Sequence, residues 1–278
     1  MAQTPRQMTI DERLSARRSL AAGKNRMASD FQGKVVLITG GTRGIGRALA
    51  LQLADEGALL ALNYMSRAAD ADQVISEIEA RGTRAVAVAG DVSQPDSARD
   101  IVAAARKSLG PIDMLVTSAG ISIPGSADDL SWERWKTTLN INLDGTFNMI
   151  YAVKDEMIER RFGRIVTVSS IAGLRERENQ VAYSTSKAGV IAITRCVAQA
   201  WARHNVRVNC VCPGLTETEM AHTLSPEVHK VILENTPLGR IGRPEEIANL
   251  ARFLLSEQSS YMTGQTVVAS GGRVMLPG

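Results

Sequence analysis

From Lys34 onward, short apolar runs alternate with longer segments whose apolar residues recur at helical spacing. Continuous apolar, β-branched runs are typical of strands buried on both faces, and their alternation with helices predicts βαβ units. Right-handed crossovers then give an α/β fold of three layers, a doubly wound parallel sheet of the Rossmann type. We expect strands at 35–39, 59–62, 85–89, 112–117, 164–169, 206–211 and 266–269, and helices at 45–56, 69–81, 96–109, 131–160, 183–204 and 244–255.

Two segments of the chain lie outside this alternation. Residues 1–30 are polar and basic and hold no strand-like run, so we expect a flexible tail that precedes a single catalytic domain at 31–278. Residues 214–236 show no clear periodicity between a strand and the last helix. An unstructured connection of that length is often an active-site lid, so we expect a substrate lid over about 214–236.

The charge of the chain is concentrated in the tail. Residues 1–26 sum to +4 and the whole chain to +3, so residues 27–278 sum to −1. A near-neutral domain with 4% aromatic residues offers neither a basic patch nor a stacking surface, so we expect no nucleic-acid partner. No apolar stretch reaches the ~18 residues that span a bilayer, and no secretory signal precedes the domain. We therefore expect a cytoplasmic protein without a membrane partner.

The cysteines of the sequence predict neither a disulfide framework nor a metal site. The three cysteines, Cys196, Cys210 and Cys212, are odd in number and clustered, which argues against a disulfide framework. Cys210 and Cys212 alternate within a predicted strand and would point to one side, but no second pair of soft ligands completes a zinc site. We expect buried thiols and no metal.

A glycine-rich turn follows the first predicted strand. Glycines at this point let the backbone turn tightly and approach a pyrophosphate, while the amides of the next helix donate to the phosphates. The spacing is Gly-x-x-x-Gly-x-Gly and not the commoner Gly-x-Gly-x-x-Gly, so the inference depends on the position of the turn in the βαβ series. The predicted phosphate-binding residues are Gly40, Thr42, Arg43, Gly44, Ile45 and Gly46.

The end of the second strand indicates which dinucleotide binds. NAD sites usually place an acidic residue there for the ribose hydroxyls, and residues 63–67 contain none. Arg43, Ser66 and Arg67 could hold a 2′-phosphate instead, since a guanidinium donates two parallel hydrogen bonds to such a group. The sequence therefore predicts that NADP(H) is preferred over NAD(H).

A Tyr–Lys pair supplies the candidate catalytic groups. Tyr183 and Lys187 are four residues apart, so they share one face of the predicted helix. A phenol titrates near ~10, and a neighbouring ammonium lowers that pKa toward the range useful for general acid–base catalysis. Ser170 follows a predicted strand at the carboxyl edge of the sheet, where its hydroxyl could bind a substrate oxygen. The pattern indicates proton transfer to a carbonyl or from an alcohol.

Taken in order, these motifs resemble the short-chain dehydrogenase/reductase family over residues 31–272. The matching pieces are the glycine-rich turn, Asp91-Val92, Ser118-Ala119-Gly120, Asn142, Ser170, Tyr183 with Lys187, and Pro213-Gly214. Each piece is moderately specific and the ordered set is highly specific. The resemblance implies an enzyme that transfers a hydride between a nicotinamide and a carbonyl or secondary alcohol. The intact Tyr–Lys pair disfavours a non-catalytic dinucleotide sensor.

The resemblance also implies a role for each residue. Tyr183 would exchange the proton, Lys187 would lower its pKa and bind the nicotinamide ribose, Ser170 would orient the substrate, and Asn142 would hold a water of a proton relay. The other implied cofactor contacts are Asp91 and Val92 at the adenine, the stretch Ser118, Ala119 and Gly120, and Pro213, Gly214, Thr216 and Thr218 near the carboxamide. The chain departs from the family at Thr117-Ser118, where Asn-Asn is common, and at Thr216, where an apolar residue is common.

The substrate class stays open. Residues 240–246 and 261–265 resemble the 3-oxoacyl-[acyl-carrier-protein] reductase branch, but sugar, alcohol and steroid dehydrogenases share these pieces. If the substrate is carrier-bound, we expect Arg160, Arg161 and Arg203 to meet an acidic carrier near the cleft. The helices at 131–160 and 183–204 resemble those of the family's tetramer interface, which implies a homotetramer.

Overall fold

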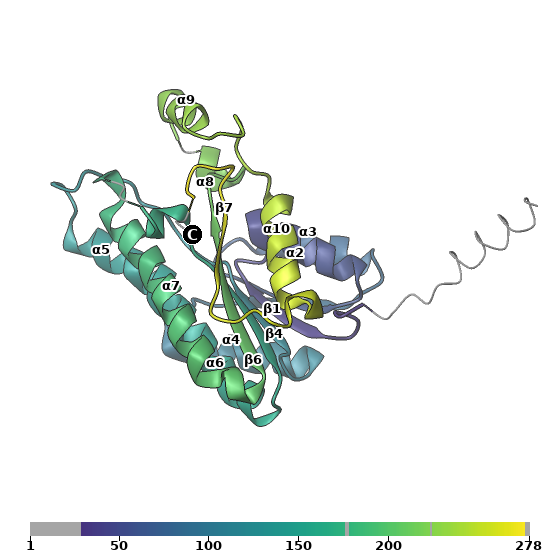
Figure 1. Ribbon diagram of the computed structural model, residues 1–278. Helices are drawn as coiled ribbons and strands as arrows, with labels where there is room; N and C mark the ends of the chain where they lie inside the picture. The colour runs from purple at the N-terminus through teal and green to yellow at the C-terminus, as the bar shows by residue number, and fades with distance from the viewer. Residues whose placement is uncertain (1–28, 176–177, 223, 276–278) are drawn as a thin grey trace, which may run out of the picture.

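The computed structural model describes residues 29–175, 178–222 and 224–275 (Figure 1). Seven strands form one parallel sheet in the order β3-β2-β1-β4-β5-β6-β7, so the predicted parallel sheet is confirmed. The predicted tail lies outside the described residues up to position 28. The strands are β1 Val35–Thr39, β2 Leu59–Tyr64, β3 Ala85–Ala89, β4 Met114–Thr117, β5 Gly163–Val168, β6 Val206–Pro213 and β7 Thr266–Ala269.

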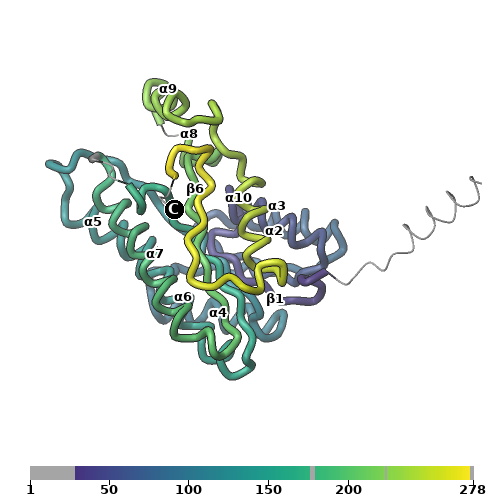
Figure 2. Tube along the Cα trace, viewed as in Figure 1, coloured from purple at the N-terminus to yellow at the C-terminus, as the bar shows by residue number. Residues whose placement is uncertain are grey.

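Helices cover both faces of the sheet, which gives the three predicted layers (Figure 2). On β1, Val36 and Ile38 pack into the core shared with α2, α3 and α10, whereas Val35 and Leu37 pack into the core shared with α4, α6 and α7. This alternation explains why the strand reads as an unbroken apolar run. The helices are α2 Gly44–Asp55, α3 Ala68–Glu79, α4 Pro95–Leu109, α5 Trp132–Leu139, α6 Gly145–Glu159, α7 Val181–Trp201, α8 Glu219–His222, α9 Pro226–Glu234 and α10 Pro244–Leu255.

The strand order reverses between β1 and β4, which is where open α/β sheets bind their ligands. The Thr39 hydroxyl, at the end of β1, accepts hydrogen bonds from the backbone N–H groups of Ser118 and Ala119, each at 3.1 Å. Gly40 has a φ of 60°, and a side-chain carbon there would lie 3.0 Å from the Ala119 Cα. Glycine is therefore required where the two strand ends meet.

Two predicted segments differ in the structure. The helix expected over 131–160 is interrupted by a π-helical turn, Asn140–Asp144, between α5 and α6. The stretch 214–236, expected as an unstructured loop, contains α8 and α9. Ser225 caps α9 by accepting a hydrogen bond from the Val228 N–H, and Pro226 occupies the first helical turn, where it costs no hydrogen bond. That start signal was present in the sequence and was missed.

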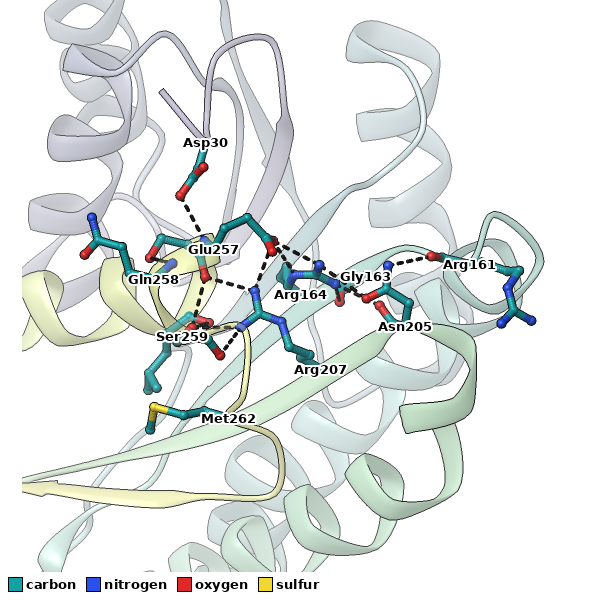
Figure 3. A network of polar contacts seen from close by, with 12 residues as sticks. Asp30, Arg161, Gly163, Arg164, Asn205, Arg207, Glu257, Gln258, Ser259 and Met262 are labelled. Atoms are coloured by element: carbon teal, nitrogen blue, oxygen red, sulfur yellow. Dashed lines mark hydrogen bonds and ion pairs between the residues drawn. The ribbon is translucent and has the colours of Figure 1, made fainter. Parts of the chain in front are cut away.

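At the amino edge of the sheet, two arginines share one carboxylate (Figure 3). The side chains of Arg164 and Arg207 are 4% and 8% exposed, and both donate to Glu257 Oε1, at 3.0 and 3.2 Å from their Nη2 atoms. Arg207 also donates to the carbonyl of Ser256, and Arg164 to that of Asn205. The cluster fastens the chain after α10 to the first residues of β5 and β6, at the end of the sheet opposite the candidate site.

Candidate active site

Helix α7 carries Tyr183 and Lys187, the two residues predicted from the sequence to be catalytic. The Lys187 ammonium is buried, donates to the Val168 carbonyl at 2.9 Å and lies 5.7 Å from the centre of the Tyr183 ring. Val168 is the last residue of β5, so this hydrogen bond fixes the lysine to the carboxyl edge of the sheet. The predicted Tyr–Lys pair is thus brought together beside the strand end that leads to Ser170.

Burial sets the charge state of the lysine. It lowers the pKa of Lys187 to about 8, while the nearby sulfur groups of Cys210 and Cys212 act in the opposite direction. Both cysteines are buried on β6, with their Sγ atoms 4.0 Å apart, as the strand pattern predicted. With a pKa of about 8, most Lys187 side chains carry a proton at neutral pH. The ammonium can then stabilise a negative charge on the Tyr183 oxygen.

The π-helical turn places Asn142 between two other segments. Its side chain accepts a hydrogen bond from the Ile121 N–H at 2.8 Å and donates to the Ile121 carbonyl and the Ser186 hydroxyl, each at 3.0 Å. Ser186 in turn donates to the Tyr183 carbonyl at 2.7 Å. Asn142 therefore links the chain after β4 to the first turn of α7. Ser186 was not singled out in the sequence, and the role of Asn142 toward a water stays a prediction.

Ser170 begins the short 3₁₀ turn Ile171–Gly173 after β5. Its Oγ accepts a hydrogen bond from the Ala172 N–H at 3.1 Å, which leaves its own proton available for another acceptor. A side-chain carbon on Gly173 would lie 2.7 Å from the Lys187 carbonyl carbon, so this turn lies directly against α7. The hydroxyl is thus held on a rigid support next to the helix that carries Tyr183.

The glycine-rich turn connects β1 to α2. Gly44 has a φ of 52°, and a side-chain carbon on Gly46 would lie 2.3 Å from the Gly40 carbonyl oxygen, so the turn closes tightly on itself. The N-cap residue of α2, Arg43, makes no side-chain hydrogen bond to the amides of the first turn. Helix N-termini without such a cap can donate to a phosphate. Thr42 lies in the turn and Ile45 is the second residue of α2; their contact with a phosphate stays a prediction.

The ends of β3 and β4 bring the other predicted cofactor contacts to the same edge. Asp91 Oδ1 accepts from the Ser93 N–H at 2.9 Å, and the Val92 carbonyl accepts from the buried Asn148 of α6 at 3.0 Å. After β4, a side-chain carbon on Gly120 would lie 3.5 Å from the Lys187 Nζ. The chain after β4 therefore runs past the Tyr–Lys pair as well as past the glycine-rich turn.

Residues 213–218 approach this edge from β6. The Gly214 N–H donates to the Ala269 carbonyl at 2.8 Å, and Thr216 is buried and pairs with Gly242 in an isolated bridge. The Thr218 methyl would lie 3.2 Å from a side-chain carbon on Gly44, so it packs on the glycine-rich turn. Pro213, Gly214, Thr216 and Thr218 are thus anchored beside the candidate site.

The residues expected at a 2′-phosphate also converge. Arg43 and Arg67 both form ion pairs with Glu219 of α8, at 2.9 and 3.0 Å, and Arg67 lies 3.5 Å from Asp70. These side chains, except Arg67, line a surface pocket of about 270 Å³. Ser66 precedes Arg67 in the loop between β2 and α3. Sequence reasoning missed Glu219, because nothing in its neighbourhood indicated which surface α8 would contact.

One set of residues was placed wrongly from the sequence. Arg160, Arg161 and Arg203 were expected near the cleft, but Arg160 pairs with Asp113 before β4, at 2.5 Å, and Arg161 donates to the Arg203 carbonyl. Arg203 follows the last residue of α7, whereas Tyr183 lies in its first turn. Twenty helical residues span about 30 Å. The three arginines therefore lie at the opposite end of the sheet from the candidate site.

Two features are absent from the described part of the chain. Its histidines, cysteines and acidic residues form no group of three or more placed to hold a metal ion. None of its helices combines the length and apolar character that crossing a bilayer requires.

Comparisons with known proteins match nearly the whole of this fold. The family model described as Enoyl-(Acyl carrier protein) reductase matches residues 40–273. The chain is 36% identical over 242 residues to 3-oxoacyl-[acyl-carrier-protein] reductase FabG of Staphylococcus epidermidis, covering 87% of this chain and 99% of that protein. It is 39% identical over 244 residues to the Synechocystis 3-oxoacyl-[acyl-carrier-protein] reductase, covering 87% and 98%. The crystal structure of gox2181 superposes with a TM-score of 0.84 at 34% identity, covering 87% and 96%.

Proposed function

Because the chain belongs to the short-chain dehydrogenase/reductase family, we propose that it is an NADP(H)-dependent 3-oxoacyl-[acyl-carrier-protein] reductase. Family membership makes it an NAD(P)-dependent oxidoreductase that moves a hydride between the nicotinamide and a carbonyl or secondary alcohol. The narrower substrate rests on the names of relatives that are 36–39% identical over most of the chain. The motifs at 240–246 and 261–265 favour the same branch.

The observation that best supports the reaction type is the buried ammonium of Lys187, 5.7 Å from the Tyr183 ring. Burying a charged amine is costly and is tolerated where a hydrogen bond and a function retain it. Here one of the three ammonium N–H groups donates a hydrogen bond to the Val168 carbonyl. The two remaining N–H bonds can serve a phenolate oxygen and a ribose hydroxyl.

In the proposed reduction, the bound nicotinamide supplies the hydride to the carbonyl carbon. The Tyr183 hydroxyl gives its proton to the carbonyl oxygen as that oxygen gains electron density, and Lys187 stabilises the phenolate left behind. The Ser170 hydroxyl donates a hydrogen bond to the same oxygen and thereby orients it. Oxidation of an alcohol uses the same groups in reverse, with Tyr183 as the base.

The choice of NADP(H) over NAD(H) rests on charge. Arg43 lines the surface pocket, and Arg67 forms an ion pair with Glu219, which lines it too. The Asn63 amide at the end of β2 donates to the carbonyls of Val88 and Gly90. Asn63 is thereby committed to the backbone of β3, and no carboxylate stands at that position. Arginines at this place suit a 2′-phosphate, with Ser66 as an additional donor.

We extend the proposal to the organisation of the whole enzyme. Residues 31–278 act as one catalytic domain after the tail at 1–30, and residues 214–236 act as a lid over the substrate. The enzyme works as a homotetramer in the cytoplasm, a reducing setting that suits its three free cysteines. Arg160, Arg161 and Arg203 are not assigned to the carrier, since they lie far from the cleft.

A substrate panel tests the proposed function. The full chain is assayed with NADPH and with NADH against a 3-oxoacyl thioester, its carrier-bound form, an enoyl thioester, a sugar ketone and a steroid ketone. We expect the 3-oxoacyl substrates with NADPH to give the highest kcat/KM. Faster turnover of the enoyl thioester would favour the activity in the family model's description, and faster turnover of a sugar or steroid ketone would move the enzyme to another branch.

A further inference from the structure

Glu219, the first residue of α8, joins two arginines from distant parts of the chain. Its Oε2 lies 2.9 Å from Arg43 Nη1 and its Oε1 lies 3.0 Å from Arg67 Nη1. Arg43 precedes α2 and Arg67 precedes α3, so the carboxylate bridges the N-terminal ends of both helices. Among the ion pairs of the described residues, Glu219 is the only acidic partner that Arg43 and Arg67 share.

The contact holds α8 on the glycine-rich turn. Thr218, the residue before Glu219, packs against Gly44. A side-chain carbon added to Gly44 would lie 3.2 Å from the Thr218 methyl carbon. Glu219 and Arg43 both line the 270 Å³ pocket together with Thr42 and Asp70. The side chains of Arg43, Arg67 and Glu219 are 51%, 55% and 51% exposed, so water and solutes reach all three.

A carboxylate that gives one oxygen to each of two arginines makes the interactions that a phosphate monoester would make at the same place. A phosphate carries more charge and three acceptor oxygens, so it can take over both arginines. It would also repel a carboxylate left beside it. We propose that Glu219 is a specificity-determining residue: it competes with the 2′-phosphate of NADP(H) for Arg43 and Arg67, and its displacement frees α8 from the glycine-rich turn.

The inference rests on the proposed preference for NADP(H), and it implies that NADP(H) binding carries a free-energy cost. NADPH must break two ion pairs that NADH, which lacks the 2′-phosphate, leaves in place. The wild-type preference for NADPH is therefore smaller than the two arginines alone would give. Since α8 lies within the proposed lid at 214–236, the same displacement couples cofactor binding to movement of that lid.

Binding measurements on Glu219→Gln test the competition. Glutamine keeps the size of the side chain but removes its charge, and exposed ion pairs are individually weak. We expect the Kd of NADPH to fall about three- to tenfold and the Kd of NADH to stay within about twofold. Adenosine 2′,5′-bisphosphate should follow NADPH, and adenosine 5′-phosphate should follow NADH.

The matched control is Glu217→Gln, which removes the same charge two residues earlier in the chain. It reports the general effect of a less negative surface on an anionic ligand. We expect this variant to bind NADPH with nearly the wild-type Kd. An equal gain in NADPH affinity in both variants would overturn the specific role of Glu219.

Hydrogen exchange supplies a readout that does not depend on catalysis. Without dinucleotide, amides 217–222 should exchange faster in Glu219→Gln than in the wild type and in Glu217→Gln. In the wild type, adenosine 2′,5′-bisphosphate should speed exchange there, whereas adenosine 5′-phosphate should not. Unchanged exchange in all of these comparisons would overturn the coupling to α8.

Failure of the inference can be separated from failure of the proposed cofactor choice. Arg43→Ala and Arg67→Ala in the wild-type background decide that choice: each should weaken NADPH binding about ten- to a hundredfold and spare NADH. If this holds and Glu219→Gln changes nothing, the inference alone is wrong. If Glu219→Gln weakens NADH binding, Glu219 serves the adenosine ribose hydroxyls, and the inference is also wrong. If the wild type binds NADH more tightly than NADPH, both are wrong.

Discussion

Lys187 is almost completely buried, and its surroundings explain how it keeps its charge there. The Val168 carbonyl accepts a hydrogen bond from the ammonium, and the backbone after β4 passes close enough that a side-chain carbon on Gly120 would stand 3.5 Å from the Nζ. A bulkier residue at 120 would crowd both this ammonium and Asn142 Oδ1, which would lie 3.2 Å away. Burial lowers the pKa of Lys187 to about 8, so the charge on which Tyr183 depends is retained at neutral pH and lost in mild alkali.

The rate of carbonyl reduction should therefore fall as the pH rises through about 8. The sign follows from Lys187: once it is deprotonated, it no longer stabilises the phenolate that Tyr183 becomes when it gives its proton to the substrate. The measurement is kcat against pH at saturating NADPH and substrate. A rate that stays level to about two pH units above neutral would contradict the assigned role of Lys187.

For single residues, the sequence predicted those whose role follows from their chemical type and local spacing. It missed those whose role depends on contacts with distant parts of the chain. The spacing of Tyr183 and Lys187 places them on one helical face, and the structure brings them together. Glu219 could not be predicted, because its partners are 176 and 152 residues away in the chain. Arg160 was misplaced, because a charge on a helix does not reveal which end of the sheet it reaches.

Among the elements, the π-helical turn between α5 and α6 has the clearest bearing on the site. It carries Asn142, whose buried side chain joins Ile121 to Ser186 on α7. Such turns are often found at functional sites, yet they do not disturb the apolar period enough to be seen in a sequence. The helix at 131–160 was predicted from that period, and only its interruption was missed.

The cluster of Arg164, Arg207 and Glu257 makes a prediction about stability. Burial raises the pKa of Glu257, but the hydrogen bonds and charges of the two arginines outweigh it, and the pKa is lowered below 4.5. Glu257→Gln leaves two neighbouring guanidinium groups without their shared counter-charge. Because the Glu257 side chain is 54% exposed, water screens part of the interaction, and we expect a loss of about 1–2 kcal/mol in the free energy of unfolding.

The pH dependence of that loss has a definite sign. A carboxyl group whose pKa is depressed on folding stabilises the protein above its unfolded pKa, and this contribution disappears as the pH falls through the folded pKa. Urea melts of wild type and Glu257→Gln should therefore differ at neutral pH and converge below the ordinary carboxyl range. Glu79→Gln, an exposed carboxylate on α3, is the control and should show no such difference. Equal stability of the Glu257→Gln protein at neutral pH would show that the cluster does not stabilise the fold.

On the scale of the whole molecule, the helical layer formed by α4, α6 and α7 has aromatic groups on its outer side. Phe147 and Tyr151 of α6 are 42% and 41% exposed and stack with ring centres 4.1 Å apart. Trp201 at the end of α7 meets the Tyr151 ring edge-on at 6.0 Å. Aromatic side chains gathered on a surface are typical of contacts between protein chains, which supports the proposed homotetramer.

Phe147→Arg should disrupt that assembly, because it places an unpaired charge among stacked rings. Sedimentation of the wild type at micromolar concentration should give the mass of a tetramer, and the variant should give a smaller species. Val231→Arg on α9, a residue 54% exposed, is the control and should keep the wild-type mass. A wild-type mass equal to that of the 29.9 kDa monomer would rule the tetramer out.

The central claim is that Tyr183 exchanges the proton with the substrate oxygen, and Tyr183→Phe tests it most directly. The change keeps the ring and removes the hydroxyl, while the candidate phosphate and adenine contacts lie on other elements. We predict that kcat falls by about 10²–10⁴. The Kd of NADPH, measured by fluorescence titration, should change by less than about threefold. Near-normal turnover in Tyr183→Phe, on a substrate that the parent enzyme uses well, would show that the proton comes from another group and would contradict the account.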